Sequence, residues 1–425
     1  MPIQAPKGTR DILPSEIHRW HHLESIIRDI CGAFGYGEIR VPLFEHTELF
    51  SRGVGETTDV VQKEMYTFED KAGRSITLRP EATAGVTRAF IEHGMTSLPL
   101  PQKYYYYGPM YRYENVQRGR YREFWQFGCE ILGAPGPDAD VEIISILQTL
   151  FARTGLTKTD LRVNSIGCPE CRPAYYKLLR EFLESKVDNL CADCRGRISR
   201  NPMRIIDCKQ ERCKAEVAGA PMALDHICGE CAEHFEGVKE GLSRLGIGYT
   251  IDKSIVRGLD YYTRTVFEYI SDNVKSLGST ICGAGRYDGL VGVCGGPETP
   301  GVGFSIGIER LLIELDANGV ALPGPKGPDI FIITAGDAAK SYAPRLVNEL
   351  RVAGIGAEFD LNGRSVKAQM KYADKRGAVY AAVIGDDEIA NGKAALRRMA
   401  DGSENEITLN YGEIIKFIGD TYGTR

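Results

Sequence analysis

Four arginines lie close together in one aromatic segment of this 425-residue chain. They are Arg112, Arg118, Arg120 and Arg122, and a glycine and aromatic side chains stand between them. A guanidinium can bind a phosphate through two hydrogen bonds at once, and a loop between two strands can close over a nucleotide. The segment therefore predicts a phosphate-binding hairpin. The alternative is a basic hairpin that only water contacts.

A second segment places an arginine in apolar surroundings. Residues 301–312 alternate small and apolar residues before Glu309 and Arg310 begin a predicted helix. Glycine lets a ligand approach the backbone closely, and an arginine in such sequence requires an anionic partner. That partner is either a triphosphate or a carboxylate of the core.

A third pair of segments, residues 256–268 and 282–290, embeds polar groups in strand-like sequence. Arg257, Asp260 and the adjacent Tyr261 and Tyr262 are the clearest examples. Buried polar groups are almost always hydrogen-bonded. We therefore expect these side chains to face a cleft or to pair with each other.

Eight of the twelve cysteines cluster between residues 168 and 231, where three C-x2-C pairs and a looser fourth pair occur. Two such pairs brought together would form a tetrahedral zinc site. We expect a structural zinc ion there, and the alternative is reduced thiols that pack as small hydrophobic side chains. The expected ligands are Cys191, Cys194, Cys228 and Cys231, with Cys208 and Cys213 as substitutes.

The hydrophobic pattern predicts the elements that must position these groups. Helical spacing covers residues 15–34 and 138–154, and strand patterns cover 104–113 and 123–133, on either side of the arginine-rich segment. Helical pieces such as 172–187 lie between the cysteines and indicate an insertion. Strand-like sequence resumes near residue 249.

A proline- and glycine-rich run at residues 320–328 is typical of a linker. Beyond it, strands at 330–334, 356–359 and 378–384 alternate with helices at 340–352 and 365–376. Such alternation predicts a small α/β domain with a largely parallel sheet.

Composition excludes several classes of protein. The net charge of −5 argues against general binding of polyanions, so any nucleic-acid contact must be local. There is no run of 18 apolar residues and no signal-peptide core at the start, so we expect no membrane span and a cytoplasmic protein. Disulfides are not expected in that compartment.

Six segments, in order along essentially the whole chain, resemble the bacterial histidine–tRNA ligases, a family of class II aminoacyl-tRNA synthetases. They are residues 35–45, 77–83, 112–130, 257–268, 284–290 and 301–312.

The resemblance implies an α+β fold. Residues 1–167 and 249–322 would form a catalytic domain whose six-stranded antiparallel sheet is flanked by helices and carries histidine and ATP. Residues 168–248 would be the cysteine-rich helical insertion, and residues 326–425 an α/β anticodon-binding domain. It also implies a homodimer with an interface around Pro42, and histidine, ATP with Mg²⁺, and tRNA(His) as ligands.

The resemblance also implies a role for each matching residue. On the ATP side, Arg112 would meet the α-phosphate, Arg310 the γ-phosphate, and Glu114 and Phe124 the adenine, with Arg120 nearby. Arg257 would bridge the histidine carboxylate and the α-phosphate, so that Arg112 and Arg257 are the expected catalytic residues. The histidine side would be completed by Glu81, Thr83 and Gln126 at the α-amino group, and by Glu130, Tyr261 and Tyr262 around the imidazole.

Contacts with tRNA are expected at two places. Gln117 belongs to the loop that meets the acceptor stem in the family, although Asn115 and Val116 replace an arginine and a proline that are common there. Lys367, Lys371 and Lys375 recur every four residues and would form one charged helix face. We expect this face to meet tRNA phosphates, and the alternative is a solvated surface.

Two other functions compete with this one. The regulatory subunit of ATP phosphoribosyltransferase shares the catalytic fold but typically lacks the anticodon domain and the ATP-binding arginines. Arg112, Arg257, Arg310 and residues 326–425 argue against it. Other class II ligases share the general motifs but not residues 257–268.

Overall fold

The computed structural model describes residues 2–56, 58–271 and 280–422. It divides into two compact units, Met1–Pro323 and Gly324–Arg425. Within the described residues, no helix has the length and apolar character that crossing a lipid bilayer requires.

An eight-stranded sheet organises the described part of the N-terminal unit, in the order β1-β5-β6-β11-β10-β9-β7-β8. The short edge strands β1 and β8 pair in parallel with their neighbours, and the six strands between them are antiparallel. The expected six-stranded antiparallel sheet is therefore confirmed. The strands are β1 (Gly37–Glu38), β5 (Gln102–Tyr111), β6 (Glu123–Leu132), β7 (Asp160–Ser165), β8 (Thr250–Ile251), β9 (Thr263–Ile270), β10 (Thr280–Arg286) and β11 (Gly301–Gly307).

Strand β6 shows how the sequence divides the two faces of this sheet. Side chains alternate along a strand, so Phe127, Cys129 and Ile131 point to one face while Gln126 and Glu130 point to the other. The first three belong to the main hydrophobic core. The opposite face is polar, and the candidate functional site lies on it.

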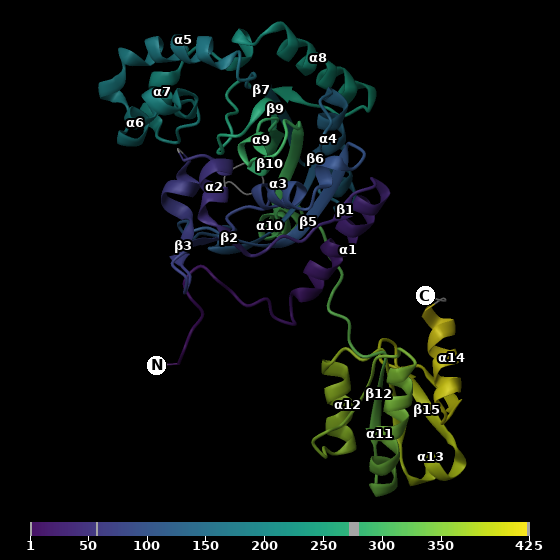
Figure 1. Cartoon of the computed structure of the whole chain (residues 1–425). Helices are drawn as coiled ribbons and strands as arrows, with labels where there is room; N and C mark the ends of the chain where they lie inside the picture. Colours follow the sequence, from purple (N-terminus) through teal and green to yellow (C-terminus); the bar gives the residue numbers. More distant parts are fainter. Residues whose placement is uncertain (1, 57, 272–279, 423–425) are drawn as a thin grey trace. The chain divides into compact units, whose positions relative to one another are not determined.

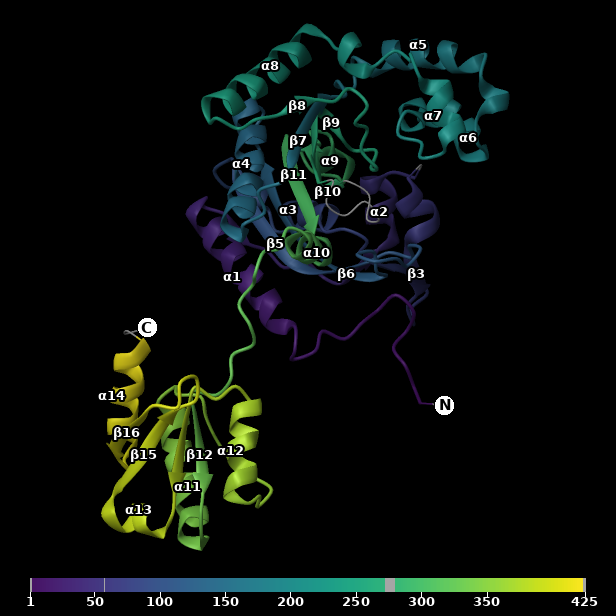
Figure 2. The ribbon, with the colours of Figure 1, turned by 180° about the vertical axis from the view of Figure 1, so that it is seen from behind.

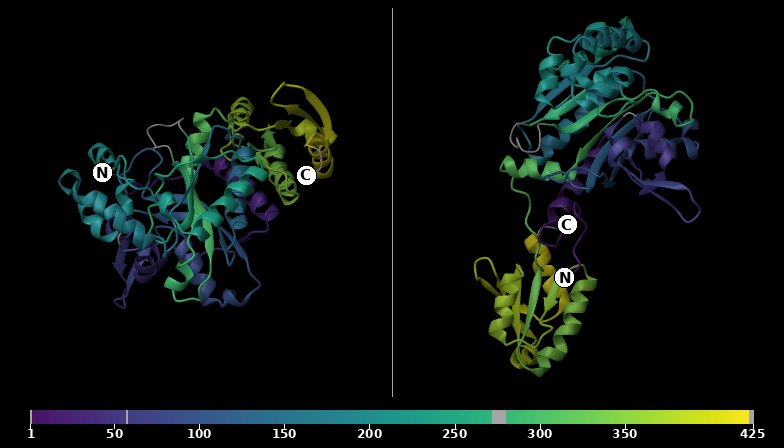
Figure 3. Two further views of the ribbon diagram at one scale, coloured as in Figure 1. Left: turned by 90° about the horizontal axis from the view of Figure 1, so that it is seen from above. Right: turned by 90° about the vertical axis from the view of Figure 1, so that its left-hand side faces the viewer.

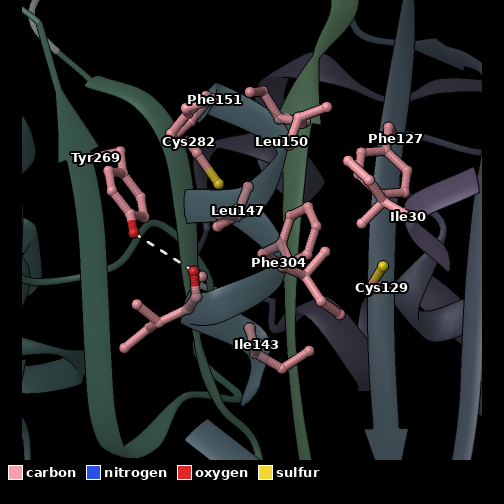
Figure 4. Packing of buried hydrophobic residues seen from close by; sticks show 14 of the residues in the cluster. Ile30, Phe127, Cys129, Ile143, Leu147, Leu150, Phe151, Tyr269, Cys282 and Phe304 are labelled. Atoms are coloured by element: carbon pink, nitrogen blue, oxygen red, sulfur yellow. Dashed lines mark hydrogen bonds between the residues drawn. The ribbon is translucent and has the colours of Figure 1, made fainter. Parts of the chain in front are cut away.

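Helices α1 (Ile17–Ala33), α4 (Pro137–Thr154) and α10 (Ile308–Ala317) contribute to the core on the apolar face. Figure 4 shows Leu147, Leu150 and Phe151 of α4 beside Phe304 of β11 and Tyr269 of β9. Tyr269 donates a hydrogen bond to the backbone carbonyl of Ile144, at 3.4 Å. Both helices expected at 15–34 and 138–154 are thus present, with ends that differ by at most two residues.

Smaller elements frame the polar face. Helices α2, α3 and α9 pack against each other there, and a second sheet has the order β2-β4-β3. The bounds are α2 (Thr47–Val54), α3 (Thr83–Glu92), α9 (Leu290–Val293), β2 (Phe44–His46), β3 (Tyr66–Glu69) and β4 (Ser75–Leu78), with short helical turns η1 (Val60–Glu64) and η2 (Met95–Ser97).

The insertion is helical, as expected, and its teal helices gather at one end of the N-terminal unit (Figures 1, 2 and 3). Its last helix packs on α4 through Phe235, Val238 and Leu242, which join the main core. The remaining helices share a separate core with residues of the 255–266 segment. The elements are α5 (Arg172–Glu184), η3 (Val187–Asn189), α6 (Ala192–Arg200), η4 (Pro202–Ile205), α7 (Glu211–Val217), η5 (Ala223–His226) and α8 (Gly229–Arg244).

The C-terminal unit is an α/β domain around a five-stranded sheet in the order β13-β12-β14-β15-β16. The first three strands are parallel, as expected, whereas β15 and β16 add an antiparallel hairpin beyond the predicted elements. The elements are β12 (Ile330–Thr334), α11 (Asp337–Val352), β13 (Ala357–Phe359), α12 (Val366–Lys375), β14 (Tyr380–Ile384), α13 (Asp386–Asn391), β15 (Lys393–Arg398), β16 (Glu404–Thr408) and α14 (Tyr411–Tyr422).

Candidate active site

A cavity of about 680 Å³ lies on the polar face of the large sheet. The twelve residues expected at the histidine and ATP sites come from four separate segments, 77–83, 112–130, 257–268 and 301–312, and all of them line this cavity. They are Glu81, Thr83, Arg112, Glu114, Arg120, Phe124, Gln126, Glu130, Arg257, Tyr261, Tyr262 and Arg310.

Glu130 lines this cavity and is almost completely buried. Its carboxyl group accepts hydrogen bonds from the Thr83 hydroxyl at 2.6 Å and from the Tyr287 hydroxyl at 2.5 Å. Burial raises the pKa of Glu130 to about 8, because loss of water outweighs these two hydrogen bonds, which lower it. Gly303 of β11 is its partner in the sheet, and a β-carbon there would come within 1.7 Å of the carboxyl group.

Glu81 and Gln126 form an adjoining polar group. The Glu81 carboxyl accepts from the backbone N–H groups of Thr83 and Ala84, at 2.9 and 2.8 Å, and so satisfies the start of α3. Burial raises the pKa of Glu81. The Oε1 atom of Gln126 is buried and has no hydrogen-bond partner in the described part of the chain. A buried acceptor of this kind is costly unless a ligand supplies a donor.

Two contacts hold Arg257 in place. Its guanidinium forms an ion pair with Glu268, whose other oxygen accepts from Thr280 at 2.8 Å. Its backbone carbonyl accepts a hydrogen bond from Arg204 of the insertion at 2.7 Å. On β10, a β-carbon at Gly283 would come within 1.7 Å of the Arg257 guanidinium. The absence of a side chain at Gly283 therefore makes room for Arg257.

The arginine-rich hairpin forms the other end of the cavity. Arg112 donates to the Pro80 carbonyl at 2.8 Å and lies 5.4 Å from the centre of the Phe124 ring. Glu114 stands between Arg112 and Arg120, at 3.9 and 3.5 Å from their guanidinium nitrogens. Arg310, at the start of α10, reaches the same cavity, where burial and the charge of Arg120 lower its pKa. These groups form a cationic surface beside an aromatic ring.

Three residues that sequence reasoning did not assign to the site also contribute. Tyr287 belongs to the 284–290 segment that was already singled out. An aromatic residue between two charged residues was the sequence signal that could have pointed to it. Glu268 ends another such segment. Arg204 lies in the insertion, where nothing in its sequence points to a contact with Arg257.

The residues expected to contact tRNA are not among those that line this cavity. Gln117 is exposed at a tight turn, where it exchanges two backbone hydrogen bonds with Arg120. Lys367, Lys371 and Lys375 are exposed on α12 of the C-terminal unit, and none of them forms an ion pair with another described residue. Ser365 occupies the position before α12, but its side chain makes no capping hydrogen bond.

The structure corrects the expected set of zinc ligands. Cys191, Cys194, Cys228 and Cys231 do not come together as one group. Instead, two separate groups of four sulfur atoms form, each with all its sulfurs within 4.8 Å of one another. They are Cys168, Cys171, Cys228 and Cys231, and Cys191, Cys194, Cys208 and Cys213. Spacing identified the pairs but not their partners, because partner choice depends on how the intervening helices fold.

Comparisons with known proteins agree along both units. A family described as "Histidyl-tRNA synthetase" matches residues 8–311, and one described as "Anticodon binding domain" matches residues 329–421. The chain is 60% identical to a histidine–tRNA ligase of Acetivibrio thermocellus over 96% of this chain and 98% of that protein. A histidine–tRNA ligase of Caldanaerobacter subterraneus is 52% identical, with the same coverage of each chain.

Structural comparison leads to the same family. The crystal structure of apo histidyl-tRNA synthetase from S. aureus matches with a TM-score of 0.84 and 40% identity, covering 98% of this chain and 100% of that one. The match extends over the sheet, the insertion and the C-terminal unit. By sequence and by fold, this chain belongs to the histidyl-tRNA synthetase family.

Proposed function

We propose that this chain ligates L-histidine to tRNA(His) at the expense of ATP, through a histidyl-adenylate. One observation carries the proposal: twelve residues from four distant segments, each with an expected role in this reaction, line a single cavity. The names of the relatives that are 60% and 52% identical support it.

Recognition of the histidine side chain falls to Glu130 and Tyr262. A neutral imidazole offers one N–H donor and one nitrogen acceptor. The Glu130 carboxylate accepts from the first, and the Tyr262 hydroxyl donates to the second, while Tyr261 packs beside Tyr262 with 4.7 Å between ring centres. An amino acid without both groups would leave buried polar atoms unpaired, so it would bind weakly.

The α-amino group of histidine is assigned to Gln126, Glu81 and Thr83. The buried Oε1 atom of Gln126 needs a donor, and an ammonium group supplies three. Glu81 adds a carboxylate whose charge favours the ammonium form. Thr83 can turn its hydroxyl from Glu130 toward the ligand, because Tyr287 still holds Glu130.

ATP is assigned to the arginine-rich end of the cavity. Phe124 offers a ring face for the adenine, and Glu114 an acceptor for its amino group. Arg112 meets the α-phosphate and Arg310 the γ-phosphate, with Arg120 beside Glu114. Arrival of the base would displace the Arg112 guanidinium from above the Phe124 ring toward the phosphates.

In the activation step, an oxygen of the histidine carboxylate attacks the α-phosphorus. A bond forms between that oxygen and phosphorus as the bond to pyrophosphate breaks, and no proton needs to move. Negative charge grows on the α-phosphate oxygens, where Arg112 and Arg257 stabilise it. The Glu268 ion pair holds Arg257 ready for this role.

Magnesium fits this site as the companion of ATP. It prefers oxygen ligands, and Glu64 provides a carboxylate on the wall of the same cavity. This side chain, with the phosphates and water, would hold the ion, which shields phosphate charge when bound.

In the transfer step, the terminal ribose hydroxyl of tRNA attacks the carbonyl carbon of the adenylate, and AMP leaves. No histidine lines the cavity among the described residues. Of its buried carboxyl groups, Glu81 and Glu130 are committed to histidine, and Glu309 accepts from the backbone N–H of Trp125. We therefore assign the hydroxyl proton to a phosphate oxygen of the adenylate itself.

The tRNA would contact both units. Gln117 sits at the tip of the hairpin beside the site, where the end of the acceptor stem must arrive. The α12 face formed by Lys367, Lys371 and Lys375 would meet phosphates near the anticodon. Its exposed charges support that assignment.

The remaining assignments concern assembly. We infer a cytoplasmic homodimer, zinc bound by the insertion, and a division into a catalytic domain (1–167 and 249–322), the insertion (168–248) and an anticodon-binding domain (326–425). The regulatory-subunit alternative is not favoured, because the ligase relatives match nearly the full chain and the cationic groups remain in the cavity.

The test is amino-acid-dependent exchange of pyrophosphate into ATP, measured with all twenty amino acids and without tRNA. Exchange with histidine alone is expected, followed by charging of tRNA(His) transcripts. Folded protein that supports no exchange would instead favour the non-catalytic regulatory subunit.

A further inference from the structure

Two groups of cysteines in the insertion have the geometry of metal sites. The first, here called the neck site, consists of Cys168, Cys171, Cys228 and Cys231. The second, the head site, consists of Cys191, Cys194, Cys208 and Cys213. In each group one atom from every residue lies within 4.8 Å of the other three, and seven of the eight side chains are buried.

The sulfur–sulfur distances of the neck site match a tetrahedral ion. Cys168 and Cys171 are 3.5 Å apart, Cys168 and Cys228 are 4.0 Å apart, and Cys171 and Cys231 are 3.8 Å apart. Four thiolates at a zinc–sulfur distance of about 2.3 Å stand about 3.8 Å from one another. A disulfide would require about 2.05 Å. The separations therefore fit a shared ion and not a covalent bond.

Backbone N–H groups already point at these sulfurs. In the neck site, Cys228 donates to Cys171 at 3.0 Å. In the head site, Cys194 donates to Cys191 at 3.4 Å and Cys191 donates to Cys213 at 3.2 Å. Such donors offset the negative charge of thiolates and fix their orientation around a metal. Cys191 and Cys228 also stand directly before helices α6 and α8.

The two sites close nested loops. The neck site joins the start of the insertion at residues 168–171 to the start of its last helix at 228–231, and the head site joins α6 to α7 inside that loop. The helices between them are short and share a modest core that includes the head-site cysteines. Small helical units of this kind need cross-links, because their apolar area alone cannot offset chain entropy.

We propose that the insertion binds two zinc ions, each through four cysteine thiolates, and that the head ion positions the insertion against the histidine site. Four soft thiolates in a tetrahedron select zinc or iron, and zinc is the redox-inert choice for a structural role. The first half of the proposal depends only on the cysteines.

The second half rests on the proposed function and on the segment between Cys194 and Cys208. Arg204 of this segment donates to the backbone carbonyl of Arg257 at 2.7 Å, and Asn201 donates to Asp260 at 2.8 Å. Cys191 and Cys208 themselves line the cavity. An ion that fixes both ends of this segment therefore fixes Arg204, which acts as a positioning residue for Arg257.

Metal content tests the first half. Full-length protein from zinc-supplemented cells, freed of loose metal by gel filtration, should contain two zinc ions per chain by inductively coupled plasma mass spectrometry. A thiol-specific mercurial should release two equivalents from the wild-type protein, which needs no variant to fold. Zero or one equivalent, or iron in place of zinc, would overturn the two-site proposal.

Paired variants assign the ions. Cys228→Ser with Cys231→Ser, and Cys208→Ser with Cys213→Ser, should each lose one equivalent, while Cys294→Ser, outside both groups, should keep two. After exchange into cobalt, each single-site protein should show the visible absorption of tetrahedral thiolate coordination. Two zinc ions in every variant would contradict the assignment.

Kinetics test the positioning role. The head variant, and separately Arg204→Met with both ions retained, should raise the KM for histidine roughly three- to tenfold, the effect of one missing hydrogen bond. The neck variant should leave that KM unchanged. Equal KM values for histidine in all proteins would reject the link between the head ion and the histidine site. They would leave the two-zinc half of the proposal standing. Wild-type protein with two zinc ions but no histidine-dependent exchange would instead reject the proposed function.

Discussion

The absence of a β-carbon at two glycines shapes the proposed histidine site. Gly283 and Gly303, on neighbouring strands, both lie where a β-carbon would come within 1.7 Å of a functional side chain, Arg257 in one case and Glu130 in the other. These glycines are needed for the space they leave and not for their backbone angles. Strand-like sequence that carries glycine opposite a charged residue is therefore informative about a site.

Gly283→Ala should remove most of the activity without unfolding the chain. The added methyl group would push the Arg257 guanidinium away from Glu268, and misplacement of a catalytic group by about 1 Å can cost roughly 100-fold in rate. Histidine-dependent pyrophosphate exchange measures the loss. Gly289→Ala is the matched control, because nothing lies within 4 Å of a β-carbon there. Similar rates for both variants would refute this account.

Glu130 should give histidine binding a distinctive pH dependence. Its pKa of about 8 means that the empty site holds a protonated carboxylic acid at neutral pH, whereas accepting from an imidazole N–H requires the carboxylate. Binding should therefore strengthen as pH rises through 8. The ratio of kcat/KM for wild type to that for Glu130→Gln should rise about tenfold from pH 7 to pH 9, since the titration of histidine itself cancels. A constant ratio would show that Glu130 does not titrate in this range.

At the scale of elements, periodicity was enough to predict the scaffold. The antiparallel hairpin β5–β6 and helices α1 and α4 appear where alternating and helical patterns place them, because one apolar face of each is buried in a shared core. Hairpin β15–β16 escaped prediction, since its charged strands lack a clear alternating pattern. The contact between Arg204 and Arg257 also escaped, because it depends on how the insertion folds back over the sheet.

The junction between α4 and β10 depends on a buried ion pair. Asp140 of α4 and Arg286 of β10 are both inaccessible to water, with 2.5 Å between Oδ2 and Nη2, and His234 of α8 lies 3.2 Å from the same carboxylate oxygen. Burial is the largest single influence and by itself would raise the pKa of Asp140, but the charge of Arg286 and the hydrogen bonds from His234 and Arg286 together outweigh it and lower that pKa. The folded state therefore gains stability from this group above the pKa of an unfolded aspartate, and loses it as pH falls through the lowered value.

Asp140→Asn should accordingly destabilise the N-terminal unit by about 3 kcal/mol, because Arg286 loses its buried counterion and keeps only the partly exposed Asp288, at 3.1 Å. Urea unfolding at neutral pH measures this loss. Glu24→Gln, which removes the surface pair with Arg28, is the control and should cost less than about 1 kcal/mol. The difference between the two losses of unfolding free energy should become smaller in acid, where Asp140 protonates. Equal losses at neutral pH would contradict the role given to the buried pair.

At the scale of the whole molecule, the proposed function assigns different tasks to the two units. The N-terminal unit contains every residue of the cavity, and the C-terminal unit contributes a cationic helix face. Sequence spacing could predict that face, since Lys367, Lys371 and Lys375 are four residues apart and Gln369 and Ala373 are buried on the other side of α12. Spacing could not predict which cysteine pairs combine, because the neck pairs enclose the head pairs and only the folded helices bring them together.

Charge reversal on α12 should separate the two tasks. Lys371→Glu should leave histidine-dependent pyrophosphate exchange unchanged, because that reaction takes place in the other unit without tRNA. It should raise the KM for tRNA(His), and the slope of log affinity against log salt should become shallower by about one for each phosphate that the helix no longer binds. Lys340→Glu is the matched control, because Lys340 belongs to α11 of the same unit and is already paired with Asp337 at 2.9 Å. If both variants charge tRNA as well as wild type at all salt concentrations, the α12 face is only a solvated surface. A defect confined to Lys371→Glu would establish that recognition of tRNA extends to the C-terminal unit.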